Sequence, residues 1–575
     1  MIQRKLAWTL VAASLLTLIL AACDGGEEAP TAAPTAVSPT AASPSPGSPS
    51  ATQPVSGGQP SVIDLAATNP LVTIFADTPF PPSTPEQPTG DLRHDIPSLA
   101  VGDFNDDGID DLLFGARFAD GPDDLRQGAG EAYVIFGSHD LASTIDLAEG
   151  QQDVIIFGDN GKGEAVGDGD NLGMGVAAGD LNDDGVDDII VSAPMSEGVK
   201  DPDYRTDRGD VYIIFGGADL PGTIDTAKGE QDVTIIAAEG FSLMGDSMAT
   251  GDINDDGIAD LVLGAPFAGR EPGSPHGGPR TELGEVYVIF GSPTLSGSIS
   301  IPQKQQDLTI SGSEQYSELG DAMAVGDVND DGIDDIIAVG EAADGPDGTR
   351  PNTGVVYVVF GSASLGDMVD LAKDEQDVTI LGVGADDALG FCAASGDVNG
   401  DDIDDILLVA QRASAVGGSR DTSGEAYVIL GSSDLGGTID LLAGDQDITI
   451  FGAEAHDLLS SCLAGHDVNG DGTGDIILGT GFSSGPDNAR DRAGEAYVIL
   501  GSSKLPATID PPGSTGVVLF GADAGDRFGS AVGSGDLNGD GKEEMIVVAS
   551  EAAGPENSRP DAGEVYVIEN VGASQ

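Results

Sequence analysis

The sequence predicts an all-β fold, a seven-bladed β-propeller of four-stranded blades that is closed by an N-terminal strand in the last blade. Three observations indicate this fold: a nine-residue phrase occurs seven times, each repeat holds four short apolar runs, and the N-terminal region supplies a strand pattern that the last repeat lacks. The copies of the phrase start 77, 72, 75, 70, 70 and 69 residues apart. A constant period with a constant motif means that one structural unit is repeated along the chain.

Each repeat contains four segments that are typical of strands. In the second repeat these are residues 173–180, 188–194, 209–216 and 232–237. They are rich in Val, Ile and Tyr, are bounded by Gly and Asp, and are too short for helices. Radial repetition of four-stranded sheets gives a propeller. A linear solenoid is the alternative, but it requires capping repeats, and the terminal repeats here have the ordinary pattern.

The two ends of the repeat region complement each other. After the last phrase the sequence continues with only two strand patterns, so the seventh repeat lacks its fourth strand. Residues 71–75 match the fourth-strand pattern, and residues 62–66 resemble the segment 144–148 that precedes such a strand. We therefore expect a propeller over residues 61–569, closed by its N-terminal strand without an open sheet edge, and a short tail at 570–575.

The repeated phrase has the composition of a calcium loop. Oxygen-bearing side chains occupy positions 1, 3, 5 and 9, a turn glycine occupies position 6, and the carbonyl of position 7 adds another oxygen. Ca²⁺ accepts six to eight such hard ligands in flexible geometry. Magnesium fits less well because it keeps its waters, and the phrase offers no soft ligand for zinc or copper. The predicted ligands, up to seven sites, are Asp103, Asn105, Asp107, Ile109 and Asp111; Asp180, Asn182, Asp184, Val186 and Asp188; Asp252, Asn254, Asp256, Ile258 and Asp260; Asp327, Asn329, Asp331, Ile333 and Asp335; Asp397, Asn399, Asp401, Ile403 and Asp405; Asp467, Asn469, Asp471, Thr473 and Asp475; and Asp536, Asn538, Asp540, Lys542 and Glu544.

The phrase has two other possible interpretations, a plain turn and an EF-hand-like loop. Asp, Asn and Gly favour turns even where no ion binds, but seven copies with one spacing argue against a plain turn. EF-hand and dockerin-like loops start in the same way, yet they close with a carboxylate at position 12 and continue into a helix. Here the last ligand is at position 9 and a strand pattern follows, so the loop joins two strands. We expect weaker sites in the fifth copy, where Asp402 replaces the turn glycine, and in the seventh, where Glu544 replaces the closing Asp.

The phrase, the adjoining FG sequences and the GAP at 264–266 resemble FG-GAP repeats, the units of the integrin α-subunit N-terminal propeller. The resemblance covers roughly residues 61–569 and implies that the phrase connects strands one and two on the lower face. It also implies that an upper face binds ligands through the connections between strands two and three and between strand four and the next blade. Seven calcium loops, without an integrin leg or inserted domain, favour a bacterial relative over a true integrin subunit.

The N-terminal region predicts export and a lipid anchor. Residues 1–22 have the charged and apolar parts of a signal sequence, and they end in Leu-Ala-Ala before Cys23, which resembles a bacterial lipobox with a lipidated cysteine. A transmembrane anchor is the alternative, but the apolar run is short for one. Residues 23–60 are rich in Pro, Ala, Ser and Thr and predict a disordered linker. We expect a protein outside the cytoplasm, lipid-anchored to the bacterial cell envelope.

The formal net charge of −75 makes nucleic acid and anionic membrane surfaces improbable partners. We expect membrane contact only through the lipid anchor, and a monomer. The five histidines share no register, and no nucleophile or phosphate-binding motif is present, so we predict no catalytic residues. The leading hypothesis is adhesion to, or recognition of, a protein or glycan ligand through the loops 267–283 and 159–171; an envelope enzyme, a hydrolase or lyase, or an enzyme subunit is the alternative.

Two further motifs receive structural interpretations. The tripeptide at 208–210 reads Arg-Gly-Asp, but it occupies the register that precedes the third strand in other repeats, so a packing role is favoured over a ligand role. Cys392 and Cys462 occupy equivalent positions in adjacent repeats, where the other repeats have Ser, Gly or Ala. We expect small buried side chains there, with a disulfide as the less favoured alternative.

Overall fold

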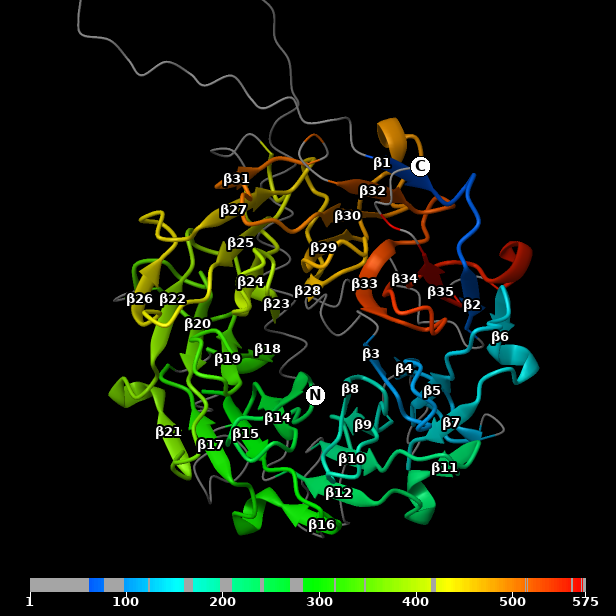
Figure 1. Ribbon diagram of the computed structural model, residues 1–575, viewed down its shortest axis with the longest axis horizontal. Coiled ribbons are helices and arrows are strands. Elements are labelled where there is room, and N and C mark those ends of the chain that lie inside the picture. Colours follow the sequence, from blue (N-terminus) through cyan, green and yellow to red (C-terminus); the bar gives the residue numbers. More distant parts are fainter. Residues whose placement is uncertain are drawn as a thin grey trace, which may run out of the picture. The chain divides into compact units, whose positions relative to one another are not determined.

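The computed structural model describes residues 61–76, 98–122, 125–159, 169–196, 209–237, 242–268, 283–314, 317–345, 348–414, 420–511, 513, 516–559, 562–569 and 571. These residues form seven sheets that follow one another around a ring (Figure 1). The predicted seven-bladed all-β propeller is confirmed. Apart from short 3-10 turns, the described ranges contain only strands and loops, and no helix in them is long and apolar enough to cross a membrane.

The blades are numbered in the order of their phrases. Blade 1 contains β3 (Leu99–Gly102), β4 (Asp111–Ala116), β5 (Glu131–Ile135), β7 (Val154–Phe157) and β11 (Thr223–Asp225). Blade 2 contains β8 (Val176–Gly179), β9 (Asp188–Ala193), β10 (Asp210–Ile214), β12 (Val233–Ile236) and β16 (Gly297–Ser300). Blade 3 contains β13 (Met248–Gly251), β14 (Asp260–Ala265), β15 (Glu285–Ile289), β17 (Leu308–Ser311) and β21 (Met368–Asp370). Blade 4 contains β18 (Leu319–Gly326), β19 (Asp335–Gly340), β20 (Val355–Val359), β22 (Val378–Leu381) and β26 (Gly437–Asp440).

The remaining three blades have the same composition. Blade 5 contains β23 (Leu389–Gly396), β24 (Asp405–Ala410), β25 (Glu425–Ile429), β27 (Ile448–Phe451) and β31 (Thr508–Ile509). Blade 6 contains β28 (Ser461–His466), β29 (Asp475–Thr480), β30 (Glu495–Ile499), β32 (Val517–Phe520) and β1 (Ser61–Asp64). Blade 7 contains β33 (Phe528–Gly535), β34 (Glu544–Ala549), β35 (Glu564–Ile568), β2 (Val72–Phe75) and β6 (Thr144–Asp146). The 3-10 turns are η3 (Leu147–Glu149), η4 (Thr226–Lys228), η5 (Ile301–Gln303), η7 (Leu371–Lys373), η8 (Pro486–Asn488) and η9 (Pro555–Asn557).

The first four strands of every blade pair antiparallel, as expected for a meander, but each sheet has a fifth strand that the four-stranded prediction did not include. This short outer strand pairs in parallel with the fourth strand; in blade 1, β11 pairs with β7 from Thr223↔Ile155 to Asp225↔Phe157. In chain order it directly precedes the fourth strand of the following blade. Each blade is therefore tied to its successor by backbone hydrogen bonds along its outer edge.

The predicted ring closure is confirmed. Strand β2 pairs antiparallel with β35, starting at Val72↔Val567, and so supplies the missing fourth strand of blade 7. The preceding strand β1 pairs in parallel with β32 of blade 6, starting at Ser61↔Val517. The N-terminal segment thus completes two blades (Figure 1), in which the blue strands β1 and β2 lie beside the last strands of the chain.

The hydrophobic core lies between neighbouring blades. The second strand of every blade is buried along its whole length, as in β9 (Asp188–Ala193). Side chains from adjacent sheets share one cluster, such as Leu113 and Val134 of blade 1 with Ile189 and Val191 of blade 2. Full burial of such a side chain contributes about 1.5–3 kcal/mol. The third-strand tyrosines are part of this packing, and Tyr427 and Tyr497 are each only 2% exposed.

Candidate metal centre

The seven copies of the phrase form the connections between the first and second strands, as predicted. We call them loops 1 to 7, and the end of the blades where they lie is called the loop end. They span residues 103–111, 180–188, 252–260, 327–335, 397–405, 467–475 and 536–544. In loop 1 the chain leaves β3 at Gly102 and enters β4 at Asp111, so the ninth position is already the first residue of the buried second strand.

The first half of each loop is folded by its own carboxylates. In loop 1, Asp103 Oδ1 accepts the N–H of Asp107 at 3.1 Å, and Asp103 Oδ2 accepts the N–H of Gly108 at 2.8 Å. Asp107 Oδ1 accepts the N–H of Ile109 at 3.0 Å. Gly108 has a φ of 80°, which explains the turn glycine at position 6. The same hydrogen bonds recur in the other six loops, so the seven loops have one conformation.

The ninth carboxylate is buried. Asp111 is 0% exposed and accepts hydrogen bonds from the N–H of Phe104 at 3.0 Å, the N–H of Gly137 at 2.8 Å and Asn105 Nδ2 at 3.1 Å. Burial, together with the weaker effect of the charges of Asp107 and Asp103, raises its pKa to about 7. The pKa is raised to about 7 in Asp188, Asp260, Asp335 and Glu544, and to about 6 in Asp405 and Asp475. A buried carboxylate beside other carboxylates is unfavourable when ionised unless a cation compensates it.

The chemistry of these loops fits a hard cation. Each loop brings carboxylates from positions 1, 5 and 9, an amide from position 3 and a carbonyl from position 7, which is the oxygen set that Ca²⁺ accepts. In the described part of the chain, however, no three Asp, Glu, His or Cys residues stand close enough to hold a metal ion together. The carboxylates of Asp103 and Asp111 accept backbone N–H groups of the loop. Calcium at the seven loops stays a prediction.

The two divergent loops keep the common conformation. Asp402, which replaces the turn glycine, has a φ of 68°, and its N–H donates to Asp397 Oδ2 at 2.8 Å. Short polar side chains such as Asp tolerate this left-handed backbone better than most. Glu544, which replaces the closing Asp, is 2% exposed and is contacted by Asn538 Nδ2. Both loops therefore retain the backbone that a metal site would need.

At the opposite end of the blades, which we call the latch end, the structure shows arginines that the sequence analysis missed. Arg126, from the connection between strands two and three of blade 1, pairs with Asp225 at the tip of the fifth strand, with Nη1–Oδ1 and Nη2–Oδ2 distances of 2.7 Å. Arg126 Nη1 also donates to the carbonyl of Gly158 at 2.7 Å. The arginine holds the pKa of Asp225 below its usual value. Equivalent pairs are Arg350–Asp440, Arg420–Asp510, Arg490–Asp64 and Arg559–Asp146.

The described ends of the candidate ligand loops, residues 159, 169–171, 267–268 and 283, lie at the latch end. Residues 160–168 and 269–282, the middle parts of the predicted recognition loops, lie outside the described residues. Of the Arg-Gly-Asp tripeptide, Arg208 also lies outside them. Asp210 begins β10, is 6% exposed and accepts a hydrogen bond from Ser196 Oγ at 2.5 Å. This placement agrees with the packing role predicted for the tripeptide.

Blade 4 contains a cavity that the sequence did not suggest. The third strands of blades 1, 3, 5, 6 and 7 carry a Glu that accepts a hydrogen bond from the Tyr two residues later. In blade 4 Val355 replaces this Glu, and the hydroxyls of Tyr357 and Ser313 hydrogen-bond at 2.9 Å instead. Val355, Tyr357 and Ser313 line a cavity of about 720 Å³ together with Glu314 and Asp344. Its walls could accept hydrogen bonds from a hydroxylated or cationic ligand.

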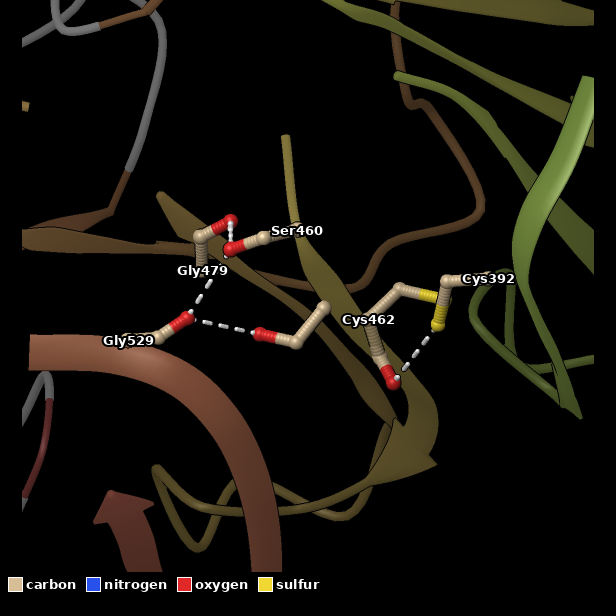
Figure 2. Close-up of a disulfide and its surroundings, with 6 residues drawn as sticks. Cys392, Ser460, Cys462, Gly479 and Gly529 are labelled. Carbon is tan, nitrogen blue, oxygen red and sulfur yellow. Dashed lines mark hydrogen bonds between the residues drawn. A yellow bond between two sulfur atoms is a disulfide. The ribbon is translucent and has the colours of Figure 1, made fainter. Parts of the chain in front are cut away.

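The two cysteines form a disulfide, so the expectation of unbonded small side chains was wrong. Cys392 of β23 and Cys462 of β28 are linked, with their Cα atoms 6.1 Å apart (Figure 2). The first strands of adjacent blades lie side by side, so equivalent positions in neighbouring repeats can meet at a distance that a disulfide spans. Beside the bond, Ser460 Oγ donates to the carbonyl of Gly479 and, like Ser461 Oγ, to that of Gly529 (Figure 2).

Cys23, the predicted signal sequence 1–22 and the linker 23–60 all lie outside the described residues, so the lipid anchor stays a prediction.

Parts of the chain are similar to known proteins. The FG-GAP repeat model matches residues 97–135, 172–214, 244–289 and 528–568. The chain is 29% identical over 397 residues to phosphatidylinositol-glycan-specific phospholipase D of Rattus norvegicus, covering 66% of this chain and 43% of that protein. It is 27% identical over 276 residues to integrin alpha pat-2 of Caenorhabditis briggsae, covering 46% of this chain and 19% of that protein. The solved structure of BBS1N in complex with ARL6DN aligns with a TM-score of 0.41 and 9% identity over 82% of this chain and 91% of that chain.

The chain spans less than half the length of these two curated relatives. The matched FG-GAP segments contain the first three strands of blades 1, 2, 3 and 7, including loops 1, 2, 3 and 7. The chain is therefore a seven-bladed β-propeller in which segments of blades 1, 2, 3 and 7 match the FG-GAP repeat, and it is similar in sequence to an integrin alpha subunit and to phosphatidylinositol-glycan-specific phospholipase D.

Proposed function

We propose that this protein is a calcium-stabilised recognition module, lipid-anchored through Cys23 to a bacterial cell envelope, that binds a protein or glycan at the latch end of its propeller. The observation that carries the proposal is the set of seven loops with one oxygen-rich composition and one conformation, all at the loop end. Calcium bound in these loops would stabilise the ring at the loop end and leave the latch end free for a ligand.

Calcium would be held by positions 1, 3, 5, 7 and 9 of each loop. When bound, it supplies positive charge that neutralises the clustered carboxylates. The chain contributes the remaining requirements: the turn at position 6, the N–H groups that orient Asp103, and the buried strand that fixes Asp111. The raised pKa of the ninth carboxylates supports this role, because a nearby cation would favour their ionised form.

Two features support a location outside the cytoplasm. Residues 1–22 have the pattern of an export signal that ends before a lipidated cysteine. The disulfide between Cys392 and Cys462 is of a kind that persists in oxidising compartments and is rare in the cytosol.

A binding assay tests the recognition function. The secreted chain without residues 1–22, with Cys23 replaced by Ser, is applied to glycan and protein arrays in CaCl₂ or in EGTA. We expect binding that needs calcium and that is lost when residues 269–282 are replaced by a Gly-Ser linker. A matched control replaces residues 513–515, which belong to a different connection. Equal binding by the unmodified chain and both loop replacements would contradict recognition at the latch end. The absence of binding on every array and in a pull-down from intact cells would contradict it as well.

The similarity to a phospholipase D supports a second candidate function. Because the chain is 29% identical over 66% of its length to that relative, we also consider an enzyme or an enzyme subunit that acts on glycosylated phosphatidylinositol. Release of a phosphatidylinositol-glycan-anchored reporter from vesicles measures it directly. Turnover by the purified chain would favour this candidate over simple recognition, and its absence together with saturable binding would favour the first.

A further inference from the structure

Neighbouring loops contact each other through position 8, which the calcium pattern does not use. The carboxylate of Asp187 in loop 2 accepts the N–H of Asp103 in loop 1 at 3.1 Å, and the N–H of Asp187 donates to the carbonyl of Asp103 at 3.1 Å. These two hydrogen bonds join position 8 of one loop to position 1, a predicted calcium ligand, of the loop before it. We call this arrangement an interloop clamp.

Three other seams between blades have the same clamp. Asp334 of loop 4 accepts the N–H of Asp252 at 2.8 Å, and Asp110 of loop 1 accepts the N–H of Asp536 at 2.8 Å. The carboxylate of Asp404 in loop 5 lies in the same place, beside the backbone that leads into Asp327, where a Cβ on Gly326 would be 2.4 Å from Asp404 Oδ2. In all three, the position-8 N–H donates back to the same partner's carbonyl, at distances of 3.1, 3.3 and 3.0 Å.

The glycine before position 1 leaves space for each clamp. A Cβ on Gly102 would lie 2.7 Å from Asp187 Oδ2, and a Cβ on Gly251 would lie 2.5 Å from Asp334 Oδ2. Loop 6 departs from this rule because His466 replaces the glycine. There Glu543 of loop 7 pairs with His466 Nδ1 at 3.0 Å rather than with the backbone of Asp467.

The clamp is missing at two further seams because position 8 has no carboxylate. Ala259 occupies it in loop 3 and Gly474 in loop 6. At the first of these seams Thr250 Oγ1 donates to the carbonyl of Ala178 at 2.6 Å, and at the second the Cys392–Cys462 disulfide joins the blades. Among the described loops, clamps therefore connect loops 7, 1 and 2 in one group and loops 3, 4 and 5 in another, while loop 6 has none.

We propose that Asp110, Asp187, Asp334 and Asp404 are positioning residues that hold the first calcium ligand of the neighbouring loop, so that calcium binding is coupled within each group of three loops. This inference rests on the proposed calcium function. Position 8 directly precedes the ninth ligand, so an ion that fixes position 9 in one loop also fixes the backbone of position 1 in the loop before it. Such coupling is reciprocal, because each site changes the affinity of the other by the same factor.

Loop-resolved hydrogen–deuterium exchange during a CaCl₂ titration tests the coupling, since the seven loops differ in sequence and give separate peptides. In the chain without residues 1–22 we expect loops 7, 1 and 2 to share one midpoint and loops 3, 4 and 5 to share another, both with steep transitions. Loop 6 should have a separate transition. Asp334→Ala should raise the midpoint of loop 3 by about tenfold, the effect of losing one charged hydrogen bond. Asp334→Asn, which keeps an acceptor oxygen, should raise the loop 3 midpoint by a smaller factor.

The matched control is Asp330→Asn, which removes the same charge from position 4 of the same loop without removing a clamp. It should leave the loop 3 midpoint unchanged, and loops 7, 1, 2 and 6 should be unchanged in every variant. Equal loop 3 midpoints in Asp334→Ala and Asp330→Asn, or an equal shift of all seven loops, would overturn the coupling while leaving the calcium function intact. No calcium-dependent protection in any loop would overturn both.

Discussion

The two ends of the propeller join neighbouring blades by different chemistry. At the latch end, Arg126 and four equivalent arginines each pair with the Asp at the tip of an outer strand from the next blade, and opposite charges meet directly. At the loop end, Asp187 and its equivalents contact the preceding loop through its backbone, and the charges that act on Asp187 are those of Asp180, Asp103 and Asp110, which are all negative. At the latch end the Asp of each pair already has an arginine partner, whereas the loop end gathers carboxylates whose ionised form a bound cation would favour. Calcium should therefore control the stability of one end and not of the other.

Removal of calcium should have the largest effect. If free calcium is about ten times the dissociation constant, each loop gains roughly 1.4 kcal/mol and seven gain on the order of 10 kcal/mol. Calorimetry should show a sharply lower melting temperature in EGTA than in CaCl₂, and MgCl₂ should restore little of the loss. An equal melting temperature in EGTA and in CaCl₂ would contradict a calcium-dependent loop end.

Loss of the disulfide should be the next largest effect. Cys392 and Cys462 are 70 residues apart and join blades 5 and 6 where the clamp is missing. A cross-link over such a segment stabilises a protein by about 4 kcal/mol. Denaturant unfolding of Cys392→Ala/Cys462→Ala in saturating calcium should show this loss, and reduction of the wild type should reproduce it. If both treatments leave the unfolding midpoint in place, this seam does not depend on the disulfide.

A buried carboxylate at the latch end should give a pH dependence that calcium does not abolish. Burial raises the pKa of Glu495 from 4.5 to about 7, and Tyr497 donates a hydrogen bond to it. Because the folded state binds this proton more tightly, the contribution of Glu495 to stability falls as pH rises from about 4.5 to about 7, by up to roughly 3 kcal/mol, and is constant above that.

Glu495→Gln keeps an acceptor for Tyr497 but cannot ionise. Its stability relative to the wild type should therefore rise with pH across this window when both are measured by denaturant unfolding in saturating calcium. Parallel pH profiles for the two proteins would show that the carboxylate does not titrate as stated.

The smallest expected loss of stability is that of one arginine–aspartate pair at the latch end. Arg490 Nη2 lies 2.8 Å from Asp64 Oδ1, and Arg490 Nη1 also donates to the carbonyls of Gly521 and Ala522. Both side chains are partly exposed, so Arg490→Ala should cost about 2 kcal/mol, less than a fully buried pair. The cost should be equal in CaCl₂ and in EGTA, and Lys504→Ala, which removes one exposed charge, should cost little. A cost that vanishes in EGTA would mean that the two ends are not independent.

The repeat made most of the fold predictable from sequence. Seven phrases determined seven blades, and the match of residues 71–75 to a fourth strand identified the closing strand β2. The position of loops 1 to 7 between strands one and two followed from the strand pattern after position 9. These features depend on local pattern and period, which a single sequence displays.

Contacts between repeats were the part that sequence analysis missed. The fifth strand β11 is only three residues long, and its partner β7 belongs to the preceding blade. Arg126 and Asp225 are likewise distant in sequence, although the recurrence of both residues at fixed positions was a usable signal. From the sequence, the shared register of Cys392 and Cys462 was attributed to crowding. The same register places the two residues on adjacent first strands, side by side, where they form a disulfide.

Counting the bound ions tests the central claim, calcium in the seven loops, most directly. The chain without residues 1–22, with Cys23 replaced by Ser, is equilibrated in millimolar CaCl₂ and exchanged into calcium-free buffer for native mass spectrometry. It is compared with the same sample treated with EGTA. The account predicts a mass shift close to seven calcium ions that EGTA removes, and a shift of about one ion fewer when Asp467, in the unclamped loop 6, is replaced by Ala. A native chain that carries no calcium under these conditions would contradict it.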